Sequence, residues 1–305
     1  MNADAAGATS ERSVATALIA LVAGAAAMGA SPIFVRLADV GPQASAFWRT
    51  ALALPAFWLW MHVEERGLAA RPPLRFDRSI VIVGIFFAGD LFFWHLAILN
   101  TTVANATFFA VTAPVFVVAG AYFFLGERSG FRVFAGLALC LAGGSALIGQ
   151  SYQVDPARLS GDFYGVVTAF FFGAYVVAVR NARTLHSAGR LMFLSMVVTA
   201  ALLLVAAVAI EQPILPRSVA GATALLALAL VSQAGGQGLL AIALGSLPAT
   251  FSSLVIFLEA VAAAALGWIV LGEQLTLIQA LGGLLIFGGI FIALPRATVP
   301  AGAAQ

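Results

Sequence analysis

Long stretches of apolar residues alternate with short charged or turn-rich breaks along the whole chain. Residues 111–125 and 226–244, for example, carry no charged side chain. Such stretches approach the ~20 residues that a helix needs to cross a bilayer. Dividing the chain at the breaks predicts ten membrane helices. We place them at residues 14–36, 44–63, 79–100, 104–125, 132–149, 162–182, 190–210, 219–244, 249–271 and 277–294.

The composition indicates the same class of protein. Hydrophobic residues make up 62% of the 305 positions, charged residues 9%, and the mean hydropathy is +1.03, whereas a soluble domain is nearer half apolar and a quarter charged. The longest predicted loops, 64–78 and 150–161, leave no room for a soluble domain. The first apolar stretch, 14–34, is too long for the apolar core of a signal peptide. We therefore expect an all-α integral membrane protein.

The arginines predict the orientation of these helices, because cytoplasmic loops carry an excess of positive charge. If the N-terminus is inside, the cytoplasmic segments hold Arg12, Arg66, Arg71, Arg75, Arg78, Arg128, Arg132, Arg180, Arg183, Arg190 and Arg296. The outer segments then hold Arg36, Arg49, Arg158 and Arg217. This bias predicts that both termini are cytoplasmic, in a multi-pass protein of a bacterial plasma (inner) membrane.

The two halves of the chain resemble each other. The string LGER at 125–128 matches LGEQ at 271–274, residues 97–109 match 242–254, and Gly29 and Arg36 match Gly173 and Arg180. Each half would hold five helices, an odd number, so the second half is expected to be inverted relative to the first. We therefore divide the chain into two five-helix repeats, 1–150 and 151–305. Inverted repeats around a central cavity are typical of alternating-access transporters.

The repeated unit resembles the EamA family of the drug/metabolite transporter superfamily. Its first copy runs from Ala104 through Ala113-Pro114-Val115 to Leu125-Gly126-Glu127, and its second from Ala249 through Glu259-Ala260-Val261 to Leu271-Gly272-Glu273. The resemblance implies two five-helix bundles around a central cavity and the export of small metabolites, often amino acids. Length and aromatic content are also similar to those of the YddG-type aromatic amino acid exporters.

Polar and aromatic residues that share one helix face predict the cavity wall, because lipid-facing positions tolerate only apolar groups. On 162–182, Tyr164, Thr168, Phe171 and Tyr175 follow one another at helical spacing. The candidates for substrate contact are Asp90, Trp94, His95, Asn105, Phe109, Phe171, Tyr175, Gln233, Gln237 and Glu259.

Each candidate has a structural alternative. A carboxylate in mid-membrane costs ~3 kcal/mol on insertion scales unless it is paired or hydrated, so Asp90 and Glu259 either serve a cavity or fix helices through hydrogen bonds. The phenylalanines can be packing surfaces. His95 can relay protons, although a packed and satisfied histidine is the simpler interpretation.

The Leu-Gly-Glu turns and the glycine-rich helices have simpler explanations than ligand binding. Glu127 and Glu273 are expected to support tight turns between antiparallel helices, with a gating role as the alternative. The glycines of the fifth and tenth helices (Gly136, Gly143, Gly144, Gly282, Gly283, Gly288 and Gly289) permit close packing of helices, within the chain or in a homodimer.

The side-chain chemistry favours a carrier over an enzyme. Cys140 is the single cysteine, so neither a disulfide nor a thiolate metal site is expected, and no catalytic string of a membrane enzyme occurs. No buried lysine or cluster of mid-helix arginines points to phosphorylated sugars. We expect a small-molecule exporter without a cofactor, with membrane lipid as its surroundings and no nucleic acid partner. Its substrates would be neutral or aromatic amino acids or similar small amphipathic metabolites; proton-coupled efflux of lipophilic cationic drugs is the alternative.

Overall fold

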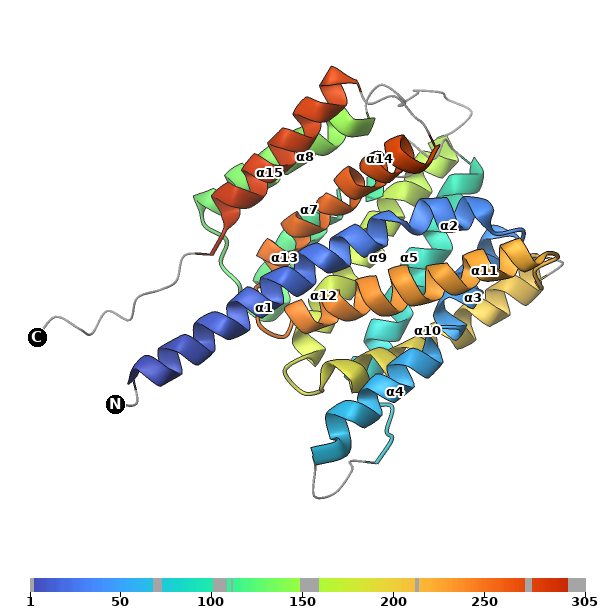
Figure 1. Cartoon of the computed structure of the whole chain (residues 1–305), viewed down its shortest axis with the longest axis horizontal. Coiled ribbons are helices and arrows are strands. Elements are labelled where there is room, and N and C mark those ends of the chain that lie inside the picture. The colour runs from blue at the N-terminus through green and yellow to red at the C-terminus, as the bar shows by residue number, and fades with distance from the viewer. Residues whose placement is uncertain are drawn as a thin grey trace, which may run out of the picture.

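The computed structural model consists of helices joined by short links in the residues it describes, which are 3–67, 73–100, 109–110, 112–148, 159–211, 214–271 and 276–295 (Figure 1). The α-helices are α1 (Ala3–Gly29), α2 (Ser31–Leu37), α3 (Pro42–Ala51), α4 (Leu54–Glu64), α5 (Arg78–Asn100), α7 (Ala113–Gly120), α8 (Phe131–Ile148), α9 (Leu159–Ala182), α10 (Ala188–Ile210), α11 (Val219–Ala227), α12 (Gly238–Ala243), α13 (Ala249–Ile256), α14 (Leu258–Leu271) and α15 (Leu277–Ala293). The described residues also form the π-helices η2 (Ala121–Leu125) and η4 (Leu228–Gln237) and the 3-10 turn η1 (Glu65–Gly67).

Six of these helical runs are long and apolar enough to cross a membrane, within the described residues. They are Val14–Leu37, Arg78–Ala97, Leu159–Ala182, Ala188–Ile210, Val219–Ala243 and Ala249–Leu266. Shorter apolar helices cover Ala113–Leu125, Phe131–Leu147 and Leu277–Ala293. The predicted stretch at 44–63 forms α3 and α4 and is not among these apolar runs, and residues 101–108 and 111 lie outside the described part of the chain. The count of ten membrane helices therefore stays a prediction.

Several predicted helices are interrupted in the structure. The helix predicted at 14–36 is divided at Ala30, two residues before Pro32, and the one at 44–63 is divided just before Pro55. Proline has no N–H to donate and is favoured in the first turn of a helix, so it marks a new helix start. The helix predicted at 249–271 is divided at Phe257 without a proline.

The first Leu-Gly-Glu turn has the conformation that its sequence predicts. Gly126 has a φ of +67° and ends η2 in the left-handed region, which is open to glycine at no steric cost. The second turn, Gly272-Glu273, lies outside the described residues.

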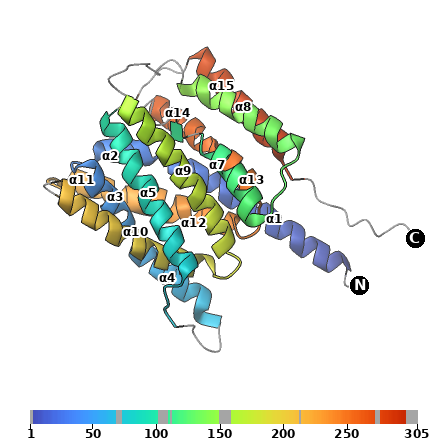
Figure 2. The same ribbon diagram turned by 180° about the vertical axis from the view of Figure 1, so that it is seen from behind.

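Helices α8 and α15 form a pair that is set apart from the other helices (Figures 1 and 2). Glycines make this packing close: a Cβ added to Gly136 would lie 2.6 Å from the carbonyl oxygen of Gly289, and one added to Gly282 would lie 2.7 Å from that of Gly143. Real Cβ atoms do not approach backbone so closely, so these four positions require glycine. The glycine-rich faces are therefore packed against each other within the chain.

Substitution of one interface glycine should separate this pair. Gly289→Leu should lower the free energy of unfolding by about 1–3 kcal/mol, because the side chain would overpack the interface. Gly288→Leu is the matched control, since nothing lies within 4 Å of a Cβ at Gly288. Thermal unfolding of the two variants in detergent measures the difference, and equal melting temperatures would contradict this packing.

Candidate functional site

A cavity of about 140 Å³ lies between helices of both halves of the chain. This is about ten times the space that one water needs. Its wall contains Met28, Ser31, Pro32, Arg49, Phe87, Asp90, Leu91, Trp94, Ala110, Ala113, Pro114, Val117, Thr168, Phe172, Gln237, Ser253, Ile256, Phe257, Glu259, Ala260 and Ala263. The wall is mostly apolar with a few charged and polar groups, which is typical of small-molecule sites.

Arg49 is the cation of this cavity. It lies in the last turn of α3, is only 5% exposed, and its Nε donates a hydrogen bond to Gln233 Oε1 at 3.1 Å. Its two Nη nitrogens donate no hydrogen bond to any described residue. Gln233 therefore orients a guanidinium whose remaining donors are available to a solute in the cavity.

Asp90 of α5 and Glu259 of α14 are the two anions of the cavity. The charges of both carboxylates act on Arg49, yet neither forms a direct ion pair with it in the described part of the chain. Neither carboxylate accepts a hydrogen bond from a described residue. A buried charge without a partner is costly, so these three groups are arranged for a polar occupant of the cavity.

The π-helix η4 places two glutamines at the site. Gln237 lines the cavity and accepts a hydrogen bond of 3.1 Å from the hydroxyl of Tyr175, while Gln233 is fully buried behind Arg49. The amide nitrogens of the two glutamines lie 3.1 Å from the sulfur atoms of Met28 and Met196, respectively. Widened helical turns of this kind occur frequently at functional sites. Here the turn fixes the orientation of both amides.

Aromatic rings form another part of the wall. Trp94, Phe87 and Phe172 line the cavity. The ring of Phe87 lies 4.6 Å from that of Tyr175, and the ring of Phe172 lies 6.0 Å from it. Tyr175 is fully buried, so it supports the aromatic wall from behind.

Nine of the ten predicted site residues lie in the part of the chain that the structure describes, and they differ in how close they come to the cavity. Asp90, Trp94, Gln237 and Glu259 line the cavity, and Gln233 and Tyr175 support it through hydrogen bonds. Phe171 instead packs against Phe86, Gly89 and Phe93, and Phe109 packs against Gly165. Asn105 lies outside the described residues. These assignments to substrate binding stay predictions.

His95 lies near the site but not in its wall. Its side chain is fully buried, and Nδ1 is hydrogen-bonded to the carbonyl oxygen of Leu91 at 2.6 Å. The ring lies 4.9 Å from Trp94 with the planes perpendicular. The other ring nitrogen, Nε2, is buried without a partner among the described residues. The ring is therefore packed but only half hydrogen-bonded, and both the relay and the packing interpretation of His95 stay predictions.

Arg49 is the functional candidate that sequence reasoning missed. The arginine distribution assigns it to the outer side of the membrane, but the structure buries it at the cavity. Its position inside the predicted helix 44–63 is only a weak signal, because a charged residue within a membrane helix indicates function but an arginine near a helix end can also snorkel to the interface. Thr168 of α9 was part of the predicted stripe and also lines the cavity; its buried hydroxyl has no partner among the described residues.

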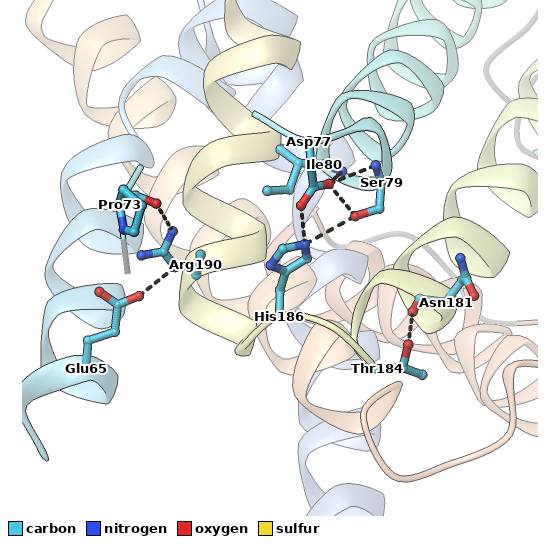
Figure 3. Close-up of polar contacts among 9 residues, drawn as sticks. All are labelled: Glu65, Pro73, Asp77, Ser79, Ile80, Asn181, Thr184, His186 and Arg190. Carbon is cyan, nitrogen blue, oxygen red and sulfur yellow. Dashed lines mark hydrogen bonds and ion pairs between the residues drawn. The ribbon is translucent and has the colours of Figure 1, made fainter. Parts of the chain in front are cut away.

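The ionisable groups at one end of the bundle, by contrast, are paired with protein groups (Figure 3). Arg190 donates to Glu65 at 2.7 Å and to the carbonyl oxygen of Pro73 at 3.0 Å, and His186 lies 2.7 Å from Asp77. Burial works to raise the pKa of Asp77, but hydrogen bonds from Ser79 and Ile80, together with His186, outweigh it and lower that pKa. These pairs hold η1 and the segment before α5 against the start of α10 and the loop that precedes it. No cluster of metal ligands occurs among the described residues.

Comparison with known proteins identifies the class. The model of the EamA-like transporter family matches the chain twice, at residues 15–148 and 159–294. The chain therefore belongs to the EamA-like transporter family, and it is a multi-pass membrane protein.

Individual relatives agree with this assignment without naming a substrate. An uncharacterized transporter of Archaeoglobus fulgidus is 26% identical over 292 residues, which cover 90% of this chain and 94% of that protein. A protein of known crystal structure superposes with a TM-score of 0.79 at 19% identity, covering 92% of this chain and 97% of the other. At that identity the superposition bears on the fold alone.

Proposed function

We propose that this protein exports neutral or aromatic amino acids, or similar small amphipathic metabolites, by alternating access. The observation that carries the proposal is the presence of Arg49, Asp90 and Glu259 around one cavity, with donors and acceptors that no described residue satisfies. A zwitterion brings one carboxylate and one ammonium, and it can satisfy both kinds of group at once.

Each end of an amino acid has a matching part of the cavity. The guanidinium of Arg49 suits a carboxylate, because its planar donors form paired hydrogen bonds with two oxygens. Asp90 and Glu259 suit the ammonium group. Trp94 and the neighbouring phenylalanine rings suit a large apolar side chain, and they also attract a cation over their faces. The similar length and aromatic content of the YddG-type aromatic amino acid exporters also support aromatic amino acids as substrates in this proposal.

Ten membrane segments in two inverted repeats, divided near residue 150, are the architecture that we propose for this activity. Reciprocal contacts support it. A Cβ on Gly29 would meet the Glu259 carbonyl oxygen, and a Cβ on Gly173 would meet that of Ala113. The LGER/LGEQ match relates residues 146 positions apart, so Ala113 corresponds to Glu259. Equivalent residues thus make equivalent contacts in the two halves, as inverted repeats require.

Further reciprocal contacts join α4 with α10 and α10 with α3. Glu64, at the end of α4, accepts a hydrogen bond of 2.8 Å from the backbone N–H of Gly189 at the start of α10. Glu211, which follows α10, accepts bonds of 2.9 Å from the backbone N–H groups of Gln43 and Ala44 at the start of α3.

The distribution of arginines supports a proposal about orientation. We propose that both termini are cytoplasmic and that the membrane is a bacterial plasma membrane.

Transport into proteoliposomes tests the proposal. Labelled phenylalanine, tryptophan and leucine should accumulate in vesicles preloaded with the same unlabelled amino acid, because a carrier exchanges substrate across the membrane. Saturable uptake with such trans-stimulation is expected, and non-saturating flux would indicate a channel. Efflux of a lipophilic cationic dye without any amino acid flux would instead favour the second candidate function, drug efflux, which the two carboxylates of the cavity also suit.

A further inference from the structure

Glu127 connects the two halves of the chain at one end of the cavity. Its carboxylate accepts hydrogen bonds from the backbone N–H of Ala249 at 3.0 Å and from the N–H and hydroxyl of Thr250 at 3.2 and 3.1 Å. These groups begin α13, so the carboxylate caps the N-terminus of a helix in the second half, where negative charge is favoured. The contact therefore holds the end of η2 against the start of α13.

Arg180 extends this connection to a third element. Its Nε lies 3.7 Å from the Glu127 carboxylate, and its Nη1 donates a 2.9 Å hydrogen bond to the carbonyl oxygen of Leu244. Leu244 directly follows α12. The end of η2, the end of α9 and the link between α12 and α13 are thus joined at one place.

The cavity lies on the side of these helices away from Glu127. On α13 and α14 its wall begins at Ser253 and continues toward Ala263, whereas residues 249–252 contribute nothing to it. All eight residues of α13 are buried. On α7 the wall ends at Val117. The structure is therefore closed between the cavity and the Glu127 end.

We propose that the contact of Glu127 with α13 and Arg180 is the gate that closes this end of the transport path. Its release would let η2 separate from α13 and open the cavity to that side. The side chains of Glu127 and Arg180 are 18% and 27% exposed, so water can hydrate both charges when the contact breaks. This gate rests on the proposed alternating-access mechanism: the release of Glu127 would be the step that opens the cavity at this end.

Thiol labelling of a buried position behind the gate tests the inference. Ser252 is fully buried between Glu127 and the cavity, and its hydroxyl has no partner among the described residues. In a Cys140→Ala background, Ser252→Cys should react slowly with a membrane-impermeant thiol reagent. Adding Glu127→Gln should raise the rate roughly tenfold, because the amide keeps one acceptor but loses the charge that strengthens these bonds. Arg128→Cys, which is exposed beside Glu127, identifies the membrane face from which the reagent reaches this end.

The control is a glutamate of similar geometry that caps a different helix. Glu211 accepts two backbone hydrogen bonds at the start of α3, so Glu211→Gln should lower stability without changing the labelling rate of Ser252→Cys. Thr250→Val removes the hydroxyl that donates to Glu127 and leaves the two backbone hydrogen bonds in place. It should therefore raise the labelling rate of Ser252→Cys by a smaller factor than Glu127→Gln does. Equal rates in the Glu127, Thr250 and Glu211 variants would overturn the gate. The assay contains no amino acid, so a failed substrate assignment cannot produce this result.

Discussion

Replacing Arg49 by glutamine should reduce amino acid transport by about a hundredfold. Removing one partner of a desolvated charge pair costs ~2–5 kcal/mol at an interface, and the substitution also leaves Asp90 and Glu259 without the cation that acts on both. The loss should be mainly in apparent affinity for the substrate carboxylate. Initial rates of uptake over a range of amino acid concentrations measure it.

Two further variants separate substrate binding from folding. Arg49→Lys keeps the charge but loses the planar donors, so it should retain part of the activity. Arg190 is a buried arginine outside the cavity, paired with Glu65, so Arg190→Gln should lower thermal stability and leave the apparent affinity unchanged. If a folded Arg49→Gln protein has the wild-type apparent affinity for the amino acid, Arg49 does not bind the substrate carboxylate.

Glu259→Gln should also abolish most transport while the protein accumulates normally. Glutamine has the shape of the protonated acid, so the helix packing around α14 is preserved, but the charge that would hold an ammonium group is lost. We expect a decrease of at least roughly tenfold, the scale of one charged hydrogen bond. Uptake rates and melting temperatures of Glu259→Gln and Glu259→Ala measure the two effects.

The structural alternative for Glu259 predicts the opposite pattern. If the residue only fixes helices through hydrogen bonds, the glutamine variant should transport nearly as well as the wild type, and only the alanine variant should unfold at a lower temperature. Undiminished flux through Glu259→Gln at every pH tested would end its assignment as the ammonium partner.

Local patterns in the sequence predict the helices and the first Leu-Gly-Glu turn well. A run of apolar residues must be helical in a membrane because no water satisfies the backbone there. Gly126 marks a left-handed helix end, which the structure contains. Proline near a helix start explains two of the interruptions after the fact, but the one at Phe257 has no local signal: it coincides with the cavity wall, which depends on contacts between distant segments.

The cavity itself was predictable only in part. Asp90 and Glu259 stood out because a charge inside an apolar stretch is costly wherever it lies. Arg49 lies only a few residues from the predicted start of its helix, where a snorkelling arginine is ordinary, so its burial became visible only with the contact to Gln233, 184 positions away. The packing of Phe171 toward Phe86 and Phe93 could not be predicted either, because helical spacing defines a face but not the neighbour of that face.

Equilibrium binding of three matched ligands tests the central claim, that the cavity recognises both charged ends of an amino acid. Phenylalanine, phenethylamine and 3-phenylpropionate share the aromatic side chain, and the last two each lack one charged end. We expect the purified protein to bind phenylalanine at least roughly tenfold more tightly than either analogue, since each lost charged hydrogen bond is worth ~1.5–3 kcal/mol. We expect Arg49→Gln to remove the preference over phenethylamine. Binding of phenethylamine as tight as that of phenylalanine by the wild-type protein would contradict the account.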